Sequence, residues 1–507
     1  RAGGGRCYQL PSVMQTYGLA GPLNCPHSAA NAPGAPGAVG LPVPGQDAEL
    51  FWQQVLSHVG FGVNAVTQGD FPNARVTLAD ALFTITDGLA SDPGAGFACS
   101  LGVAAAYRVL ALAFSADGGL LRGSWAFRRA QQIALRFQHL AMVWITHAWE
   151  KFARREEPET GMAHYDTAYI DNSAWPISLQ EINAEMTAVQ NAIAEDGRPA
   201  GHQPRWADVP HDFRDSRLKL GIVSLCAYPP DHVLPRYATS NHQIYADRHG
   251  YKYRVGRERM DPNRPPAWGK IQMMYDVIED RSVDWWLWFD CDTYFMNMTV
   301  TMDSLLYKYA RATPSGRKAS AGKRAASQAL KDGLDPGVHM LVAEDHAMLN
   351  TGAFFLRASD WSREFLQKVW GPVDSVWIDH PWWENAAILW NFLKDNSQKF
   401  REGDVAALSG GDADKGSADD MQDIYPSEVR LAPQSEFNSY HPATSHFLHD
   451  TWETGKFALA FNGVLSNTSP TVIRVLYGNY YEMACRLNGV QDKCVQVEKA
   501  LPWLGEA

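Results

Sequence analysis

Several familiar signatures are missing from this chain of 507 residues, and each absence excludes a class of protein. No two cysteines have the Cys-x-x-Cys spacing, which argues against a structural zinc site. Neither a Gly-x-x-x-x-Gly-Lys loop nor a Gly-x-Ser-x-Gly turn occurs, so the sequence indicates neither a P-loop enzyme nor a serine hydrolase. The formal net charge of -11 lacks the basic excess of a general nucleic-acid binder, so we expect no nucleic-acid partner.

Long apolar runs are also scarce. The best candidate for a membrane span, residues 97–115, is interrupted by Arg108 and is predicted to be a buried helix. The chain begins at Arg1 rather than at a methionine, so a signal or membrane anchor could precede it outside this chain. The composition, with 46% hydrophobic residues, is typical of a globular protein with a large core.

The seven cysteines suggest an oxidising compartment. The pairs Cys7 with Cys25 and Cys485 with Cys494 have spacings that suit small disulfide loops in a secretory lumen. Cys226 and Cys291 lie instead in apolar, strand-like runs, where we expect buried free thiols.

The chain divides into three predicted regions. Residues 1–46 are rich in glycine, proline and alanine and are predicted to form an arm or stalk. Residues 47–215 have helical periodicity and predict a helical accessory domain. In residues 216–507, strand-like and helical segments alternate, which predicts an α/β domain with a parallel or mixed sheet. Charge-rich stretches near 311–338 and 402–420 are predicted to be surface insertions in that domain.

Two acids at the end of an apolar strand carry the chemistry. The strand predicted over 285–289 is followed at once by Asp290-Cys291-Asp292. Uncompensated charge is costly to bury, and ligands collect at the carboxyl ends of strands. Mg²⁺ or Mn²⁺ prefers oxygen ligands and commonly binds one or two carboxylates together with substrate phosphates. The segment therefore predicts a metal and nucleotide-diphosphate site, the alternative being a surface turn with two solvated acids.

Seven segments, in the same order, resemble those of glycosyltransferase family 34. That family includes plant xyloglucan xylosyltransferases, yeast-type α-galactosyltransferases and mannan-polymerase mannosyltransferases. The resemblance covers about residues 218–465, roughly half of the chain. The segments are SNHQIYADRHGYKY (240–253), AWGKIQMMYDVI (267–278), WWLWFDCDTYFMN (285–297), LNTGAFFLRASDWS (349–362), WWENAAILW (382–390), APQSEFNSYHP (432–442) and TWETGKFALAFNG (451–463).

The resemblance implies a GT-A fold, in which a Rossmann-like mixed sheet binds the nucleotide. It implies a hexosyl- or pentosyltransferase that uses a nucleotide sugar, expected to be UDP-linked, and retains the anomeric configuration. The acceptor would be a glycan or glycoprotein. The protein would then work in the Golgi or another secretory-pathway lumen, anchored as a type II membrane protein.

The same resemblance assigns roles to individual residues. Asp290 and Asp292 would hold the metal ion, Mn²⁺ or Mg²⁺, with Asp290 also contacting the donor. Lys270 would lie on the donor side, its alternative being a solvated helix residue. Asn350 and Gly352 would line the pocket floor, and the alternative role of Gly352 is a strand kink.

Glu384 and Asn385 match the family's acidic-Gln pair beside the reacting carbon. Glu384 would stabilise an oxocarbenium-like centre or orient the acceptor hydroxyl. Asn385 is one methylene shorter than glutamine, which shortens its reach.

One position departs from the family pattern. Where the family's last segment carries a histidine that completes the metal site, this chain has Ala460. Three hypotheses follow. His446, His449 or water replaces the ligand, the metal is held chiefly by Asp292 and the diphosphate, or catalysis has been lost and the fold kept as a binding scaffold.

Overall fold

The computed structural model describes most of the second half of the chain and shorter stretches of the first. The described residues are 8–9, 22–23, 64–66, 68–71, 73–75, 97–115, 125–148, 154–156, 163–165, 179–195, 208–229, 231–312, 333–345, 349–372, 375, 377–395, 425–445, 450–464 and 470–497. By the contacts between residues the chain forms two compact units. The helical unit comprises 1–200 and 371–426, and the sheet unit comprises 201–370 and 427–507.

In the helical unit, three long helices pack side by side. α5 (Trp125–Ala148) contacts both α4 (Phe97–Ser115) and α7 (Leu179–Glu195). An ion pair of 2.6 Å between Arg108 and Glu185 joins α4 to α7. These helices confirm the helical periodicity of this region. The short strands described here are β1 (Tyr8–Gln9), β2 (Pro22–Leu23), β3 (Arg154–Glu156) and β4 (Ala163–Tyr165).

Helix α13 (Trp383–Asp395) also belongs to the helical unit, although the sequence analysis placed its residues in the α/β domain. It contacts α5, and the His380 ring nitrogen Nε2 lies 2.8 Å from the Val143 carbonyl oxygen. The predicted domain boundaries themselves stay predictions. The insertion near 402–420, and most of the arm and of the insertion near 311–338, lie outside the described residues. Among the described helices, none combines the length and apolar character needed to span a membrane.

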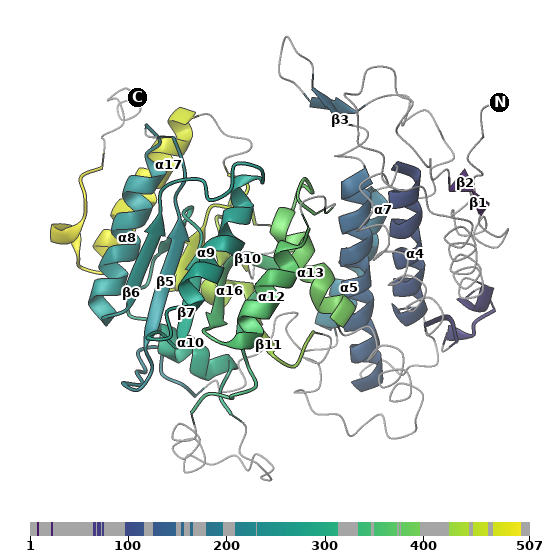
Figure 1. Ribbon diagram of the computed structural model, residues 1–507, viewed down its shortest axis with the longest axis horizontal. Coiled ribbons are helices and arrows are strands. Elements are labelled where there is room, and N and C mark those ends of the chain that lie inside the picture. The colour runs from purple at the N-terminus through teal and green to yellow at the C-terminus, as the bar shows by residue number, and fades with distance from the viewer. Residues whose placement is uncertain are drawn as a thin grey trace. The chain divides into compact units, whose positions relative to one another are not determined.

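The sheet unit is built on a six-stranded sheet. Figure 1 shows its strands lying between helices. Their order is β11 (Val429–Pro433), β9 (Met340–Glu344), β10 (Leu349–Arg357), β7 (Trp285–Phe289), β5 (Leu220–Leu225) and β6 (Lys252–Gly256). β10 runs antiparallel to both of its neighbours, and the other pairings are parallel. The predicted α/β fold with a Rossmann-like mixed sheet is therefore confirmed.

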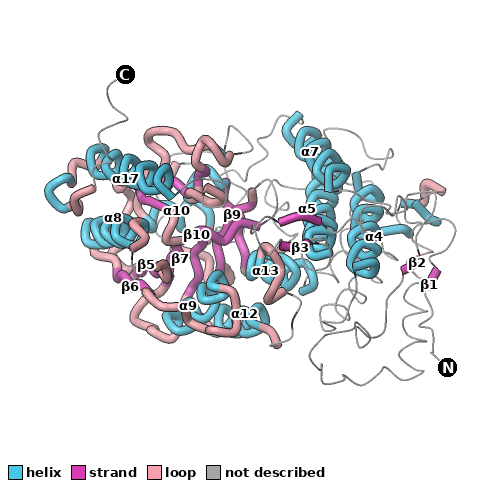
Figure 2. The backbone as a smooth tube through the Cα atoms, turned by 90° about the horizontal axis from the view of Figure 1, so that it is seen from above, coloured by secondary structure: helices cyan, strands magenta, loops and turns pink. Residues whose placement is uncertain are grey.

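Helices cover both faces of this sheet (Figures 1 and 2). α8 (Leu234–His249) shares one buried core with alternate strand residues such as Leu287, and α17 (Pro470–Leu487) packs beside α8. α9 (Gly269–Ile278) contacts β5 and β7, and α12 (Asp360–Trp370) packs on α9. Because both faces are covered, β7 is apolar at every position. The remaining helices are η3 (Pro266–Trp268), α10 (Met302–Tyr309), α16 (Gln434–Phe437) and η7 (Gln491–Lys493).

A small second sheet follows the two acids. β8 (Thr293–Phe295) pairs antiparallel with β13 (Ala458–Ala460), which pairs in parallel with β12 (Ser439–Tyr440). Thus the chain leaves β7, turns through Asp290-Cys291-Asp292 and enters a strand of another sheet.

Two polar side chains of α8 hold β8 in place. Asn241 Nδ2 donates to the Phe295 carbonyl (3.1 Å), and Asn241 Oδ1 accepts from the Phe295 N–H (2.7 Å). His242 Nε2 lies 2.7 Å from the Thr293 carbonyl oxygen, which can only accept, so Nε2 carries the proton. His242 Nδ1 then accepts from the Ser224 hydroxyl at 3.0 Å. Both side chains are fully buried, so the backbone after the acids is fixed from α8.

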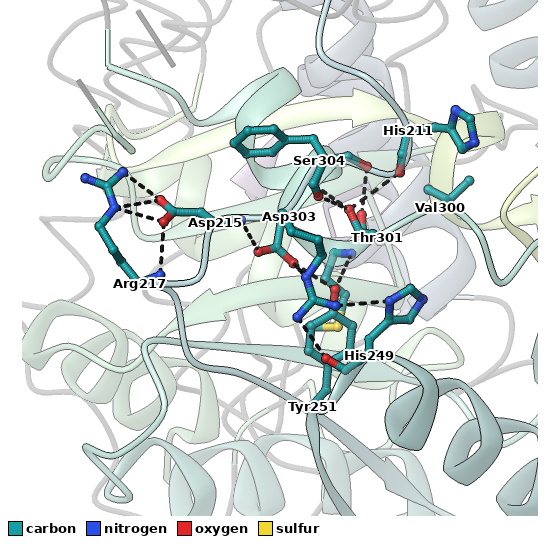
Figure 3. A network of polar contacts seen from close by, with 12 residues as sticks. His211, Asp215, Arg217, His249, Tyr251, Val300, Thr301, Asp303 and Ser304 are labelled. Carbon is teal, nitrogen blue, oxygen red and sulfur yellow. Dashed lines mark hydrogen bonds and ion pairs between the residues drawn. The ribbon is translucent and has the colours of Figure 1, made fainter. Parts of the chain in front are cut away.

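A polar network fixes the segment that leads into the sheet unit (Figure 3). Asp303, which is buried, accepts from the Asp215 N–H at 2.9 Å and from the Tyr251 hydroxyl at 2.8 Å. At the start of α10, the Thr301 hydroxyl accepts from the Ser304 N–H at 3.0 Å and caps the helix. These bonds join the segment before β5 to α10 and to Tyr251, which directly precedes β6, away from the edge that carries Asp290 and Asp292.

The tight packing of β5 on β7 yields a first prediction. A Cβ added to Gly221 would lie 2.4 Å from a ring atom of Trp286, its neighbour on β7. We expect Gly221→Ala to lower the free energy of unfolding by about 1–3 kcal/mol, measured by urea denaturation. Gly337→Ala is the control, because its Cβ would meet only a side-chain oxygen of Asp335 at 3.3 Å. Equal stability of the two variants would contradict this packing.

The buried His242 ring predicts a pH dependence of stability. Burial lowers the pKa of His242 to about 4, below its usual 6.5. Between these values the unfolded chain binds the proton more readily, so the neutral ring stabilises the fold above pH 6.5 and this contribution is lost as the pH falls toward 4. We expect His242→Gln, which cannot titrate, to reduce the loss of unfolding free energy between pH 7 and pH 5 by about 2 kcal/mol. Parallel pH profiles for the two proteins in urea denaturation would refute this assignment.

Candidate functional site

The candidate site lies at one edge of the six-stranded sheet. The carboxyl ends of the parallel strands and the amino end of β10 meet there, because β10 runs the opposite way. Polar groups follow each of these strand ends: Asp290 after β7, Asp345 after β9, Asn350 at the start of β10 and Gln434 after β11. Such an edge is where ligands bind in open α/β sheets.

Asp290 is held by three groups. Its backbone N–H donates to the Gly352 carbonyl at 2.9 Å. Its Oδ1 accepts from the Trp288 indole Nε1–H at 2.6 Å and lies 3.4 Å from the Lys270 ammonium. The sequence predicted Asp290 and Lys270 on the same site, and the structure brings them together.

Lys270 is not a solvated helix residue. Only 5% of it is exposed, and its Nζ donates to the Thr351 carbonyl oxygen (2.9 Å) and hydroxyl (3.2 Å). The ammonium also lies 5.5 Å from the centre of the Trp288 ring. α9 thus places one fixed positive charge beside Asp290, where it opposes the repulsion between two neighbouring acids.

Asp292 is partly buried and has no comparable counter-charge. Its backbone carbonyl accepts from the Phe461 N–H at 2.9 Å, which ties the turn to the end of β13. Within the described part of the chain, no hydrogen bond or ion pair from another residue reaches its carboxylate. Burial, and then the charge of Asp290, raise the pKa of the Asp292 carboxyl to about 7. A bound cation would offset both effects and stabilise the ionised carboxylate.

The donor set fits a hard divalent cation that also binds phosphate. Asp292 offers both oxygens, and Asp290 keeps one oxygen beyond the one held by Trp288 and Lys270. Two carboxylates completed by phosphate oxygens are a usual protein share for Mg²⁺ or Mn²⁺. Among the described residues, no group of three or more His, Cys, Asp or Glu side chains is placed to hold a metal alone. A metal held here would therefore depend on the ligand it shares.

Ala460 is buried in β13 and lies opposite Thr293. Its methyl group offers no ligand atom, so the described protein contributes no third ligand there. His446 and His449, predicted as substitutes, lie outside the described residues. His441 contacts this strand instead, since its N–H donates to the Ala460 carbonyl at 3.0 Å and its ring lies against Phe461.

Asn350 and Gly352 meet a cluster of polar side chains that the sequence analysis did not assign. Asn350 Oδ1 accepts from the Gly352 N–H and from Asn438 Nδ2, both at 2.8 Å, and Asn350 Nδ2 donates to the Tyr440 hydroxyl at 2.7 Å. A Cβ on Gly352 would lie 2.9 Å from Asn438 Nδ2, so glycine is required by close approach of this side chain. Tyr440 in turn donates to Asp345 at 2.5 Å.

The Gln-x-x-x-Asn-x-Tyr segment noted in the sequence supplies this cluster. Asn438, fully buried, and Tyr440, 6% exposed, are its Asn and Tyr, and Gln434 Nε2 donates to the Asn438 carbonyl at 2.5 Å. The carboxamide oxygen of Asn438 is buried and accepts no hydrogen bond from any described residue. The motif itself was therefore the signal that could have identified these residues as part of the site.

Glu384 and Asn385 begin α13 in the helical unit, whereas Asp290 and Asp292 belong to the sheet unit. Glu384 is buried, and Asn385 Nδ2 lies 3.5 Å from its Oε1. The tryptophan before them, Trp383, has a φ of 38° and is 39% exposed. The catalytic role of this pair stays a prediction.

Comparison with known proteins finds a family that resembles the part of the chain containing the two acids. Residues 223–468 match the model of the galactosyl transferase GMA12/MNN10 family. An alpha-1,2-galactosyltransferase of Schizosaccharomyces pombe is 26% identical over 166 residues, which cover 30% of this chain and 43% of the yeast protein. A second, uncharacterized alpha-1,2-galactosyltransferase of that yeast is 26% identical over 173 residues, covering 31% and 46%. The chain thus spans less than half the length of these curated relatives.

A solved glycosyltransferase involved in the glycosylation of the major capsid of PBCV-1 was also found. It shares 15% identity and a TM-score of 0.31, over 52% of this chain and 99% of that one. Residues 223–468 contain β7, both acids, the Asn350 cluster and Ala460, so the family match and the site coincide. Over residues 223–468, just under half of its length, this chain is similar to the galactosyl transferase GMA12/MNN10 family.

Proposed function

We propose that this protein is a retaining glycosyltransferase that moves a sugar from a nucleotide sugar, expected to be UDP-linked, to a glycan or glycoprotein acceptor. The observation that carries the proposal is the position of Asp290 and Asp292. They stand at the carboxyl edge of the sheet, within the residues that match this family, with one lysine for two acids. A nucleotide diphosphate with a bound cation would supply the missing positive charge and the missing ligands.

Each residue of the site has a proposed role in the reaction. Asp292 and Asp290 would hold Mn²⁺ or Mg²⁺, whose chemistry there is to neutralise the charge of the leaving diphosphate. Lys270 orients Asp290 and contributes a positive charge on the donor side. Asn350 and Gly352 form the floor on which the donor would rest, with the Gly352 backbone open to close approach. Glu384 and Asn385 are proposed to act on the acceptor side of the reacting carbon.

The setting of this reaction follows from the proposed activity. A glycan or glycoprotein acceptor places the protein in the Golgi or another secretory-pathway lumen. The disulfide between Cys485 and Cys494 suits such an oxidising compartment. A membrane anchor, if the full-length protein has one, would lie outside this chain, and nucleic acid is not an expected partner.

A second candidate function rests on Ala460. Because this position offers no ligand atom, the domain would be a binding or scaffold protein that keeps the fold without catalysis. The two candidates differ in one measurable respect, which is turnover of a donor that binds.

A donor screen tests the proposal. Purified protein with Mn²⁺ is incubated with UDP-galactose, UDP-xylose, UDP-arabinose and GDP-mannose, and release of nucleotide diphosphate is measured beside binding by calorimetry. We expect one donor to bind and to be hydrolysed slowly. Binding without turnover would favour the scaffold, and neither binding nor turnover with any donor would contradict the enzyme.

Asp292→Ala tests the site itself. We expect the affinity for UDP in the presence of Mn²⁺ to fall by more than about 100-fold, because even outer-shell changes at metal sites cost 10–100-fold. Asp360→Ala, which removes an exposed acid of α12, is the matched control. Unchanged Mn²⁺-dependent binding in the Asp292 variant would show that the metal site is elsewhere.

Glu384→Gln tests the acceptor-side assignment. We expect sugar transfer to fall by about 100-fold, as when one stabilising group is lost from a transition state, with the affinity for UDP and Mn²⁺ unchanged. Asp379→Asn, an exposed acid five positions earlier, serves as the control. Full activity of the Glu384 variant would remove this residue from the mechanism.

A further inference from the structure

Cys291, the middle residue of the Asp-Cys-Asp segment, forms a disulfide with Cys226. The sequence analysis expected two buried free thiols here, and that expectation was wrong. Both residues are buried, with 2% and 3% of their surfaces exposed, but the strands that carry them are neighbours, so their side chains meet. Cys226 directly follows β5, and its N–H donates to the Gly256 carbonyl of β6 at 2.8 Å. The turn between the acids is therefore bonded covalently to the end of β5, the strand that lies between β7 and β6.

The other ties on this turn are non-covalent, and they include the contacts of the Asp290 carboxylate with Trp288 and Lys270. The Asp290 N–H donates to Gly352, and the Asp292 carbonyl accepts from Phe461. Each hydrogen bond exchanges with water at little net cost and can open alone. The disulfide is the covalent tie on the turn. It is formed by Cys291, the residue between Asp290 and Asp292.

The turn has a particular need for such a tie. The like charges of two acids spaced by one residue repel one another. At the position where a third ligand would help to hold the metal, Ala460 offers none. Two carboxylates then provide all of the protein ligands to the metal. Their affinity for it is higher if the turn is already rigid, because less conformational entropy is lost when the metal binds.

We propose that the disulfide between Cys226 and Cys291 is a positioning clamp that holds Asp290 and Asp292 ready for the metal in the absence of a third protein ligand. The two sulfurs are bonded to each other, and the clamp would act without contacting the metal or the substrate. The clamp acts by fixing the turn, and the proposal rests on the proposed function, since it presumes that the two acids bind a metal together with a nucleotide diphosphate.

The experiment compares three forms of the full chain. The double variant C226A/C291V removes the bond while keeping apolar side chains in the space, and C226S/C291S removes it with the smallest change of shape. C485S/C494S is the matched control, because it removes the other disulfide of the sheet unit, which lies at α17 and η7. Mass spectrometry of unreduced peptides verifies which bonds are present, and calorimetry measures UDP binding over a series of Mn²⁺ concentrations.

We expect both Cys226/Cys291 variants to bind UDP with an apparent Mn²⁺ affinity weakened by about 10–100-fold, and to recover UDP binding when Mn²⁺ is raised to saturation. Recovery distinguishes a loosened turn from a lost ligand, because Asp292→Ala would not recover. C485S/C494S should keep the Mn²⁺ dependence of the unmodified protein even where its thermal stability falls.

Three results would overturn the clamp. One is an unmodified Mn²⁺ dependence in either Cys226/Cys291 variant, and another is an equal weakening in C485S/C494S, which would indicate a general loss of stability. The third is a failure of saturating Mn²⁺ to restore binding in a variant that is folded by circular dichroism. Absence of Mn²⁺-dependent binding in the unmodified protein contradicts the proposed function and the clamp together, so the two failures are distinguishable.

Discussion

Two acids, Asp290 and Asp292, stand at the end of a strand that is apolar along its whole length, and the rest of the site depends on how their charge is accommodated. β7 is buried on both faces, so it delivers the acids to a place with little water. Lys270 and the indole of Trp288 contact Asp290, and the charge of Lys270 only partly offsets the effect of burial on Asp292. Asp292 is left with a raised pKa and without a counter-ion among the described residues. The protein thus keeps a partly buried negative charge that a cation can neutralise.

The position of the acids is fixed from elements that are distant in the sequence. The reversed strand β10 contributes the Gly352 carbonyl, the Phe461 N–H follows β13, and Asn241 of α8 holds the strand that follows the acids. The Gly352 contact requires the mixed strand order, because only an antiparallel β10 brings its amino end to the edge where β7 ends. The position of the acids therefore depends on the topology of the sheet. A change that disturbs the core would be felt at the turn.

Much of this could be predicted from the sequence, and the reasons are local. An apolar run bounded by acids marks a strand that is covered on both faces, and the bounds 285–289 were obtained from it. Helical spacing likewise indicated α5 and α7. The disulfide of Cys226 was missed because its partner is 65 residues away, and an apolar setting suits a free thiol equally well. The hydrogen bonds of His242 and Asn438, and the grouping of α13 with the helical unit, likewise depend on contacts that no local pattern encodes.

Ala460 is the feature that most favours a non-catalytic scaffold, but the raised pKa of the Asp292 carboxyl argues against it. A carboxyl whose pKa is raised to about 7 destabilises the folded protein at higher pH by an amount on the order of a few kcal/mol, unless a ligand neutralises it. An asparagine at this position would keep the shape of the turn and remove the cost. A chain that needed only the fold would gain stability from that exchange, whereas a chain that binds a metal diphosphate cannot make it. This raised pKa, together with the disulfide on the same turn, is why we propose that a cation binds at Asp292.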